Sequence, residues 1–300
     1  MAGFQPLLPH LPAKSEPDGS KSPEPICFPI HPPSMAATVK ENLTLSSWLL
    51  LGGLFQGLAI YALGLRALIP TATILVFRIA DHLLMAAGIT RNRYMDGVIQ
   101  TKFSAQYPQP DGSFTATPAS QPVVVFHLAA RINHPLGMLA PGAKTLGDHA
   151  TKMVADMSAD AEKYGLLGLS HWTKQEDGAG NETMFIFYLR DYDGLHRFAH
   201  DKVHMDGVVW WTQIVKDHPH IAIFHETYVV PKGQWENIYI NSKPTGMADT
   251  LFPVKGKREF ARAPVDARSG ALRSASKRLQ FQWLEEAEGN HDQYYDKSFI

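Results

Sequence analysis

The chain has 300 residues, of which 45% are hydrophobic and 10% aromatic, which is enough for a packed core in one or two domains. The formal net charge is -1 and the pI is near 6.9, so no general electrostatic attraction exists for nucleic acid, and a nucleic-acid partner is not expected. Cys27 is the only cysteine, which excludes an intrachain disulfide and a thiolate metal cluster.

The N-terminal segment, residues 1–42, is rich in proline. Nine prolines lie between Pro6 and Pro33, interleaved with Ser, Lys and Glu. This composition disfavours a packed unit and predicts a disordered arm. It does not predict a cleavable signal peptide, because the apolar run begins too late.

Two apolar runs come next, and together they make residues 43–89 a predicted membrane region. The first, 43–65, carries no charge and is long enough, at about 1.5 Å per residue, to cross a hydrocarbon core of roughly 30 Å. We interpret it as a transmembrane helix. The second contains Arg78 and Asp81, which could pair on one helical face and so lower the cost of membrane burial. A helical hairpin and an interfacial second helix are both possible, and two buried helices of a soluble domain are the alternative.

Basic residues after the second run, at Arg91, Arg93 and Lys102, favour the cytosolic side for the remainder of the chain. We therefore predict a protein of the endoplasmic reticulum membrane whose main domain faces the cytosol. Residues 90–121 end in SAQYPQPDGSFTATPASQ, which is rich in Pro, Gly, Ser and Thr, and predict a linker.

The segment 122–246 shows a regular succession of strands and helices. Its hydrophobic periodicity predicts a strand at 122–131, a helix at 144–164, strands at 166–174 and 183–190, a helix at 193–216 broken near 201–204, and a strand at 221–230. This β-α-β-β-α-β order is that of an α+β, ferredoxin-like module. After it the pattern fades, so 247–300 is predicted to be a polar tail, solvated or with its basic part on anionic lipid.

Histidine and tryptophan are concentrated between residues 195 and 241, which hold six of the fourteen histidines and three of the six tryptophans. Titratable imidazoles and aromatic faces suit a pocket for an unsaturated organic molecule. His196, His200 and His204 are four apart, and an unbroken helix would align them as in a metal or haem site. The predicted break and the lack of an HExxH motif argue against this, and no metal ligands are predicted.

Four segments carry a family resemblance: RINHPLGMLAPG at 131–142, YGLLG at 164–168, FAHDKVHMDGVVWW at 198–211 and HETYVVPKGQWENIYIN at 225–241. They resemble a fungal and bacterial family of uncharacterised domains related to the antibiotic-biosynthesis monooxygenases. Its fungal branch, with an apolar N-terminal region ending in a segment like RIADHLLMAAGITRNRYMDGV, includes the monooxygenase of the fumagillin pathway, a terpenoid route. The resemblance implies a monooxygenase of fungal secondary metabolism, a homodimer in which two sheets form a dimeric α/β barrel, and chemistry without metal or flavin.

Oxygenation without a cofactor needs an electron-rich substrate, a base and a water-poor pocket. His204 is the first candidate base and His200 the second, with hydrogen bonding at the helix break as their alternative role. His225 is the third, and it points to the opposite face of its strand from Glu226, so only one of the two can face the pocket. The predicted substrate-binding residues are Arg131, Asn133, His127, Trp210, Trp211 and Tyr239, with core packing as the alternative for the tryptophans and a structural role for Arg131.

The sequence thus predicts a membrane-associated monooxygenase that oxidises an apolar terpenoid or polyketide intermediate. Its expected partners are that small substrate, membrane lipid and a second copy of the chain, and its expected cofactor is none. Two rival hypotheses are a haem-dependent dehydratase or peroxidase on the same fold and a non-catalytic carrier of a lipophilic intermediate.

Overall fold

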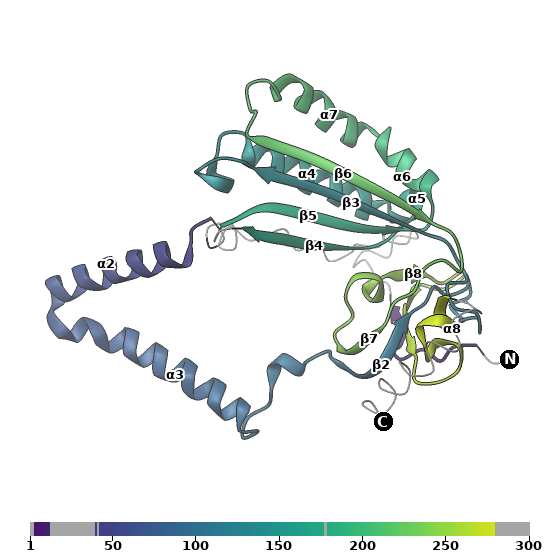
Figure 1. The fold of residues 1–300 in the computed structure, drawn as a ribbon, viewed down its shortest axis with the longest axis horizontal. Coiled ribbons are helices and arrows are strands. Elements are labelled where there is room, and N and C mark those ends of the chain that lie inside the picture. Colours follow the sequence, from purple (N-terminus) through teal and green to yellow (C-terminus); the bar gives the residue numbers. More distant parts are fainter. Residues whose placement is uncertain (1–2, 13–39, 41, 177–178, 280–300) are drawn as a thin grey trace.

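The computed structural model contains a helix-covered sheet, a second β-rich unit packed beside one end of it, and a pair of helices that project away from both (Figure 1). The structure describes residues 3–12, 40, 42–176 and 179–279. Most of the predicted proline-rich arm, with Cys27, and the acidic end of the predicted tail lie outside the described residues.

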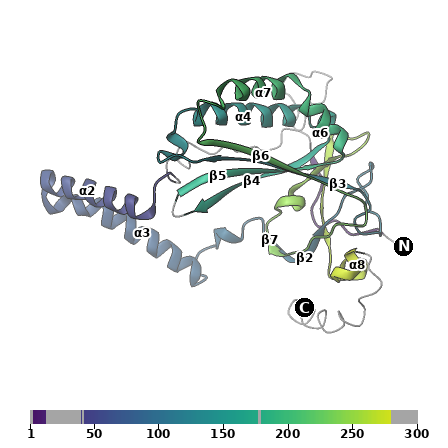
Figure 2. The same cartoon turned by 45° about the horizontal axis from the view of Figure 1, so that its top comes forward.

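The larger sheet has four antiparallel strands in the order β4-β5-β3-β6. Its strands are β3 (Val123–Ile132), β4 (Leu166–Glu176), β5 (Ala179–Leu189) and β6 (Ile221–Val230). The helical connections are α4 (Ala143–Ala159) with α5 (Ala161–Tyr164), and α6 (Tyr192–Ala199) with α7 (Lys202–Ile214), all on one face of the sheet (Figure 2). This succession and strand order are ferredoxin-like, so the predicted α+β fold class is confirmed for this module.

Two aspartates determine where the helices of the second connection begin. The side chain of Asp191 accepts a hydrogen bond of 2.7 Å from Gly194 N and starts α6. The side chain of Asp201 accepts one of 3.4 Å from Val203 N and starts α7. Short polar side chains satisfy the free N–H groups of a first helical turn, so the break predicted near 201–204 is present and has a local cause.

The core of the module lies between the helices and one half of the sheet. Val124, Phe187 and Leu189 are buried there against Met157 of α4 and Phe198 of α6. Burial of each large apolar side chain stabilises the fold by about 1.5–3 kcal/mol, so this half of the layer contributes strongly to the stability of the module.

The second unit is built from segments far apart in the sequence. One of its three-stranded sheets has the order β10-β2-β7 and contains β2 (Ile99–Ala105), β7 (Tyr239–Ser242) and β10 (Pro264–Asp266). The other has the order β1-β9-β8 and contains β1 (Leu11–Pro12), β8 (Leu251–Pro253) and β9 (Glu259–Arg262). The chain is then folded as far as α8 (Ala275–Leu279).

This second unit differs from three sequence-based expectations. The predicted linker 90–121 contains β2, the predicted tail 247–300 contains β8 to α8, and residues 3–12 of the predicted arm pair with β9 and β10. For β2 the reason is that some of its polar residues are buried as well as apolar ones. Phe103 stacks on Tyr239 at 5.0 Å, and the Asn237 side chain donates to Ala105 O and accepts from Ala105 N. Such partners, more than 100 residues away, leave no local period.

The projecting helices are α2 (Leu45–Leu63) and α3 (Leu68–Ala86), joined by the single 3-10 turn Gly64–Ala67. Gln56 fixes the turn, since its side chain donates to Ala67 O at 3.0 Å and accepts from the Thr71 hydroxyl at 2.8 Å. Each helix has 19 residues, about 28 Å. Together they form one helical stretch, Leu45–Ala86, that is long and apolar enough to cross a membrane, and none of its apolar window is buried. Asp81 pairs with Arg93, at 2.5 Å, beyond the helix end.

Candidate functional site

The register of the large sheet decides which predicted residues face the helices. On β3, Val124, Phe126 and Leu128 pack into the helix-side core. Since successive side chains of a strand alternate, His127 and Arg131 lie on the opposite, open face. His225 pairs directly with Leu128 across the β3–β6 ladder, and paired residues share a face, so its imidazole points toward the helices.

Two of the three predicted bases project into the layer between helices and sheet. The His225 ring centroid lies 5.6 Å from that of Phe126, and the His204 ring centroid lies 5.6 Å from that of Phe198. His204 Nδ1 is 2.8 Å from Ala199 O, and a carbonyl only accepts, so this nitrogen donates. The lone pair of neutral His204 is therefore on Nε2, which is the atom that can act as a base.

Part of this layer is not closed. Phe126, Leu128 and Phe185 are only half-buried although the helices lie over their face, and His225 is exposed. On the next strand His171 lies with its ring 4.8 Å from Phe185 and is hydrogen-bonded to Thr183. We refer to Phe126, His171, Phe185, His204 and His225 as the aromatic layer. It offers phenyl rings for an apolar molecule and imidazoles for proton transfer.

The helices above the aromatic layer are spaced by a small residue. Gly207 of α7 faces α4, and a Cβ built on it would lie 2.0 Å from the Met153 terminal methyl. Beside it Trp210 stacks on His149 at 4.7 Å, which joins α7 to α4 rather than to the sheet. Trp211 packs at the end of the layer, in the cluster of Ile132, Ala140, Ala143 and Ile221. The two tryptophans therefore hold the helices in place.

His200 lies outside the aromatic layer. It is the C-cap residue of α6, where its Nδ1 lies 2.9 Å from His196 O and the His200 and His196 ring centroids are 4.4 Å apart. Its side chain is exposed. This contact corresponds to the alternative role predicted for His200, hydrogen bonding at the helix break.

The open face of the sheet carries a different polar group. Tyr228 OH donates to Glu226 at 2.6 Å, which raises the pKa of the phenol, and His127 Nδ1 is 3.8 Å from the same carboxylate. Arg131 binds Glu182 at 3.1 Å and Asn133 at 2.8 Å. These contacts agree with a structural role for Arg131, and they separate Arg131, Asn133 and His127 from the two bases by the thickness of the sheet.

Tyr239 is also remote from the aromatic layer, because β7 belongs to the second unit. Burial, followed by the neighbouring Tyr188, raises the pKa of Tyr239 to about 12, so the phenol is neutral at physiological pH. Tyr107 is buried in the same region, and burial raises its pKa too. Its hydroxyl has no hydrogen-bond partner among the described residues.

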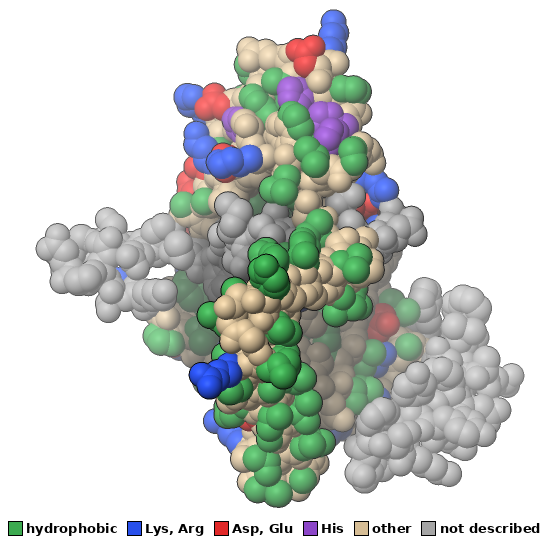
Figure 3. Space-filling model, turned by 90° about the vertical axis from the view of Figure 1, so that its left-hand side faces the viewer, with side chains coloured by type: hydrophobic (Ala, Val, Ile, Leu, Met, Phe, Trp, Pro, Cys, Tyr) green, Lys and Arg blue, Asp and Glu red, His purple; other side chains and the backbone are tan. Residues whose placement is uncertain are grey.

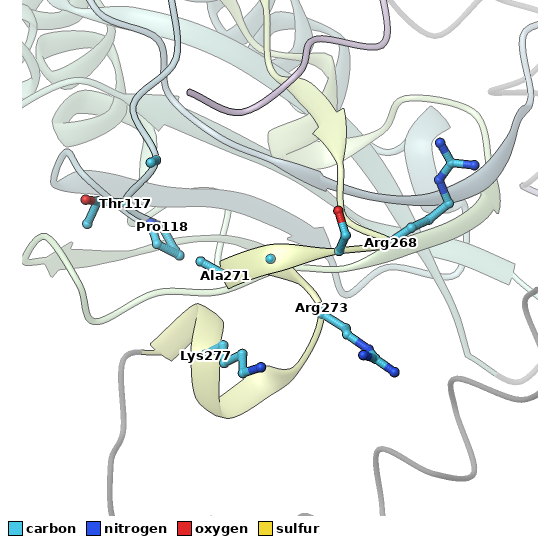
Figure 4. A pocket seen from close by; sticks show the side chains of 9 residues that line it. Thr117, Pro118, Arg268, Ala271, Arg273 and Lys277 are labelled. Carbon is cyan, nitrogen blue, oxygen red and sulfur yellow. The ribbon is translucent and has the colours of Figure 1, made fainter. Parts of the chain in front are cut away.

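An open hollow of about 540 Å³ also lies on the second unit. It is lined by Thr117, Pro118 and the segment 268–277 (Figure 4). Arg268 and Arg273 point away from each other there, and Arg268 is bound to Asp266 at 2.6 Å. The two guanidinium groups therefore do not converge on one point in the hollow. Among the described residues no group of three or more His, Cys, Asp or Glu could hold a metal ion.

Sequence reasoning did not find Phe126, His171 and Phe185. Each lies in a predicted strand that alternates, but alternation alone does not say which face the helices cover. The available signal is the pairing of Leu128 with both Phe185 and His225 in adjacent strands, and that pairing is known only from the folded sheet.

Comparison with known proteins identifies relatives of this chain. The model of the family described as "Monooxygenase af470-like" matches residues 123–247. Monooxygenase af470 of Aspergillus fumigatus is 31% identical over 245 residues, which cover 80% of this chain and 88% of that protein.

Solved structures are more distant. SnoaB, a cofactor-independent oxygenase from Streptomyces nogalater, has 14% identity and a TM-score of 0.26, and the match covers 37% of this chain and 95% of SnoaB. An aldoxime dehydratase has 13% identity and a TM-score of 0.34, covering 49% of this chain and 44% of its own. These scores are too low for a functional argument. The identity to the A. fumigatus protein along most of both chains is sufficient, and the chain belongs to the af470-like monooxygenase family.

Proposed function

We propose that the protein is a membrane-associated monooxygenase that uses the aromatic layer to oxidise an apolar, electron-rich molecule with dioxygen. The family gives the class of reaction. The support for the site is that His204 and His225 each contact a phenyl ring of the helix–sheet core, Phe198 and Phe126 respectively, and that the bond from Nδ1 to Ala199 O leaves the Nε2 lone pair of His204 available. This arrangement joins a base to apolar walls.

The chemistry that fits these groups begins with proton removal. A histidine Nε2 takes a proton from an acidic C–H or O–H of the substrate, and the resulting anion is electron-rich enough to reduce dioxygen. When the reacting carbon is a methylene between activating groups, one atom of dioxygen becomes its carbonyl oxygen and the other leaves as water with both methylene hydrogens. The substrate is then the source of all electrons. The half-buried phenyl rings shield part of the layer from water, which favours the intended reaction over side reactions. The substrate class is an apolar terpenoid or polyketide intermediate, and no metal or flavin takes part in these steps.

Variants of matched histidines test the assignment. We expect His204→Ala or His225→Ala to lower the rate of substrate-dependent oxygen consumption by about 10²–10⁴-fold, the usual contribution of a general base. His200→Ala is the control, because it removes the same side chain from the same helical region but outside the layer. Circular dichroism shows whether each variant folds. Full turnover in both His204→Ala and His225→Ala would refute the proposed base.

The substrate for this assay comes from metabolite profiling of a strain in which the gene is deleted, since the intermediate that accumulates is the substrate. The purified full-length protein then separates the rival functions. A Soret band would favour the haem-dependent dehydratase or peroxidase and overturn the cofactor-free reaction. Tight binding of the accumulated intermediate without any turnover would favour the carrier.

For the α2–α3 pair we propose insertion into the endoplasmic reticulum membrane as a helical hairpin, with the ferredoxin-like module in the cytosol. The support is the length of each helix and the exposure of apolar side chains around its whole circumference, Leu49, Phe55, Tyr61 and Phe77 among them. Such a pair would otherwise expose a large apolar surface to water. Alkaline carbonate extraction tests it: the full-length protein stays in the membrane fraction, and its release would contradict insertion.

For the open face of the sheet we propose contact with a second copy, so that two sheets close a barrel. Trp172 is 55% exposed and Phe224 39% exposed on this face, and the part of the chain that the structure describes places no layer over them. Trp172→Glu should convert a dimer to a monomer in light scattering of the detergent-solubilised protein, because it places a charge in an apolar contact. A wild-type monomer would contradict the proposal.

A further inference from the structure

A second exposed apolar element lies at the base of the helical hairpin. The short 3-10 turn Gly137–Leu139, between β3 and α4, carries Leu136 before it and Leu139 at its end, and these side chains are 53% and 62% exposed. Neither leucine belongs to the aromatic layer. Two exposed leucines on one short turn form an apolar spot on the surface, and such spots often mark a contact with lipid or another molecule.

This turn is tied directly to the start of the hairpin. The side-chain amide of Asn42 donates to Leu136 O at 2.9 Å and accepts from Met138 N at 2.7 Å. The same segment of chain enters α2 three residues later, at Leu45. The position of the turn relative to the first turn of α2 is therefore fixed by a two-point bond.

Hydrogen bonds also hold the backbone of this turn. His134 Nδ1 accepts from Leu136 N at 3.1 Å, and Gly137 N donates to His134 O at 2.8 Å. Asn133 N donates to His220 O at 2.7 Å, and the His134 and His220 rings lie 5.0 Å apart. These bonds fix the backbone conformation in which both leucines are exposed.

The bases of both hairpin helices carry the residue types of a membrane interface. Trp48, in the first turn of α2, is 37% exposed and donates from its indole nitrogen to Lys40 O. Tyr94, after α3, is 66% exposed and bonds to His82. Indole and phenol rings beside basic residues are typical of the headgroup level. Viewed from the hairpin side, hydrophobic side chains run down the hairpin and histidines lie above it (Figure 3).

We propose that Leu136 and Leu139 form a second lipid contact, which inserts into the headgroup–acyl boundary of the bilayer that holds the hairpin. The inference rests on the proposed membrane insertion of α2 and α3. Asn42 fixes the contact at the level of the first turn of α2. Two contacts, unlike one flexible tether, define an orientation: the end of the module with Trp211, Ile132 and the β3–α4 turn faces the lipid.

The proposal is tested in the full-length protein, reconstituted in phosphatidylcholine vesicles that contain doxyl-labelled phospholipid. With Cys27→Ser as background, a fluorophore is attached at Leu136→Cys or Leu139→Cys. Leu49→Cys, in α2, reports hairpin insertion, and Met205→Cys, exposed on α7, reports a site away from lipid. We expect doxyl quenching and a blue-shifted emission at positions 49, 136 and 139, and neither at 205.

The outcomes separate the two ideas. Quenching at 49 without quenching at 136 or 139 overturns the second contact and leaves hairpin insertion standing. Absence of quenching at all four positions overturns both. Asn42→Ala supplies an independent readout, because loss of the two-point bond should weaken quenching at 136 and leave that at 49 unchanged. Equal quenching at 136 with and without Asn42 would show that this side chain does not fix the turn.

Discussion

The replacement Gly194→Ala tests how closely α6 approaches the rest of the layer. A Cβ at this position would lie 2.1 Å from Tyr164 O and 2.6 Å from the Tyr164 carbonyl carbon, both of them backbone atoms. Backbone cannot rotate away as a side chain can, so α6 must move by about 1 Å to reach normal contact. The movement stretches the bond of 2.7 Å from Gly194 N to Asp191 and disturbs the packing of Leu195 and Phe198.

The magnitude follows from three contributions. A lost N-cap bond costs about 1 kcal/mol, and overpacking costs about 1–3 kcal/mol. Alanine in place of glycine in a helix returns about 1 kcal/mol. The free energy of unfolding should therefore fall by about 2 kcal/mol, which lowers Tm by about 6 °C for a domain of this size.

The measurement is thermal and urea unfolding of the detergent-solubilised protein, followed by tryptophan fluorescence. Gly147→Ala is the matched control, since nothing lies within 4 Å of a Cβ on this α4 residue, and it should raise stability by up to about 1 kcal/mol. A Gly194→Ala protein as stable as wild type would refute the close contact. An equal loss in both variants would show that glycine itself, and not the contact, matters.

The remaining predictions concern charged pairs and the width of the layer. The pKa of Asp201 is held below its ordinary value by hydrogen bonds from Lys163 and Tyr164. The contribution of the Asp201 carboxylate to stability is therefore present above the unfolded pKa of about 3.9 and lost as pH falls through the lower folded pKa. The unfolding midpoints of wild type and Asp201→Asn should differ at neutral pH and converge in acid. A difference that stays constant with pH would contradict this. Glu236→Ala removes the carboxylate 2.6 Å from Arg278, whose side chain is 6% exposed, and leaves a buried guanidinium without its counter-charge. We expect a loss of about 3 kcal/mol in urea unfolding, and a loss below about 1 kcal/mol would show that the pair is not effectively buried. Gly207→Ala places its Cβ against the flexible terminal methyl of Met153, so the free energy of unfolding should stay within about 1 kcal/mol of wild type. The displaced Met153 side chain should narrow the aromatic layer and lower turnover, and the further change Met153→Ala should restore turnover. Unchanged turnover in Gly207→Ala alone would contradict the placement of the site.

Local patterns in the sequence were sufficient for the ferredoxin-like module. The β-branched run PVVVF starts β3, and the polar residue Asp201 interrupts the second helix because its side chain caps a first turn. The uncharged run at 43–65 likewise predicts a helix long enough to cross a membrane, and α2 occupies most of that run. In each case the hydrophobic period or the helix cap depends on a few neighbouring residues, so the element can be predicted from the local sequence.

Tertiary structure alone decided which residues meet. His200 and His204 are four apart, yet only His204 enters the aromatic layer, because α6 ends and α7 sets off in a new direction between them. Strand β2 looks like linker sequence, and it becomes a central strand by pairing with Pro264 and Tyr239, more than 130 residues away. Hydrophobic periodicity records which face of an element avoids water, but not which distant element covers that face, and this is why the fold of the module was readable from the sequence while its site was not.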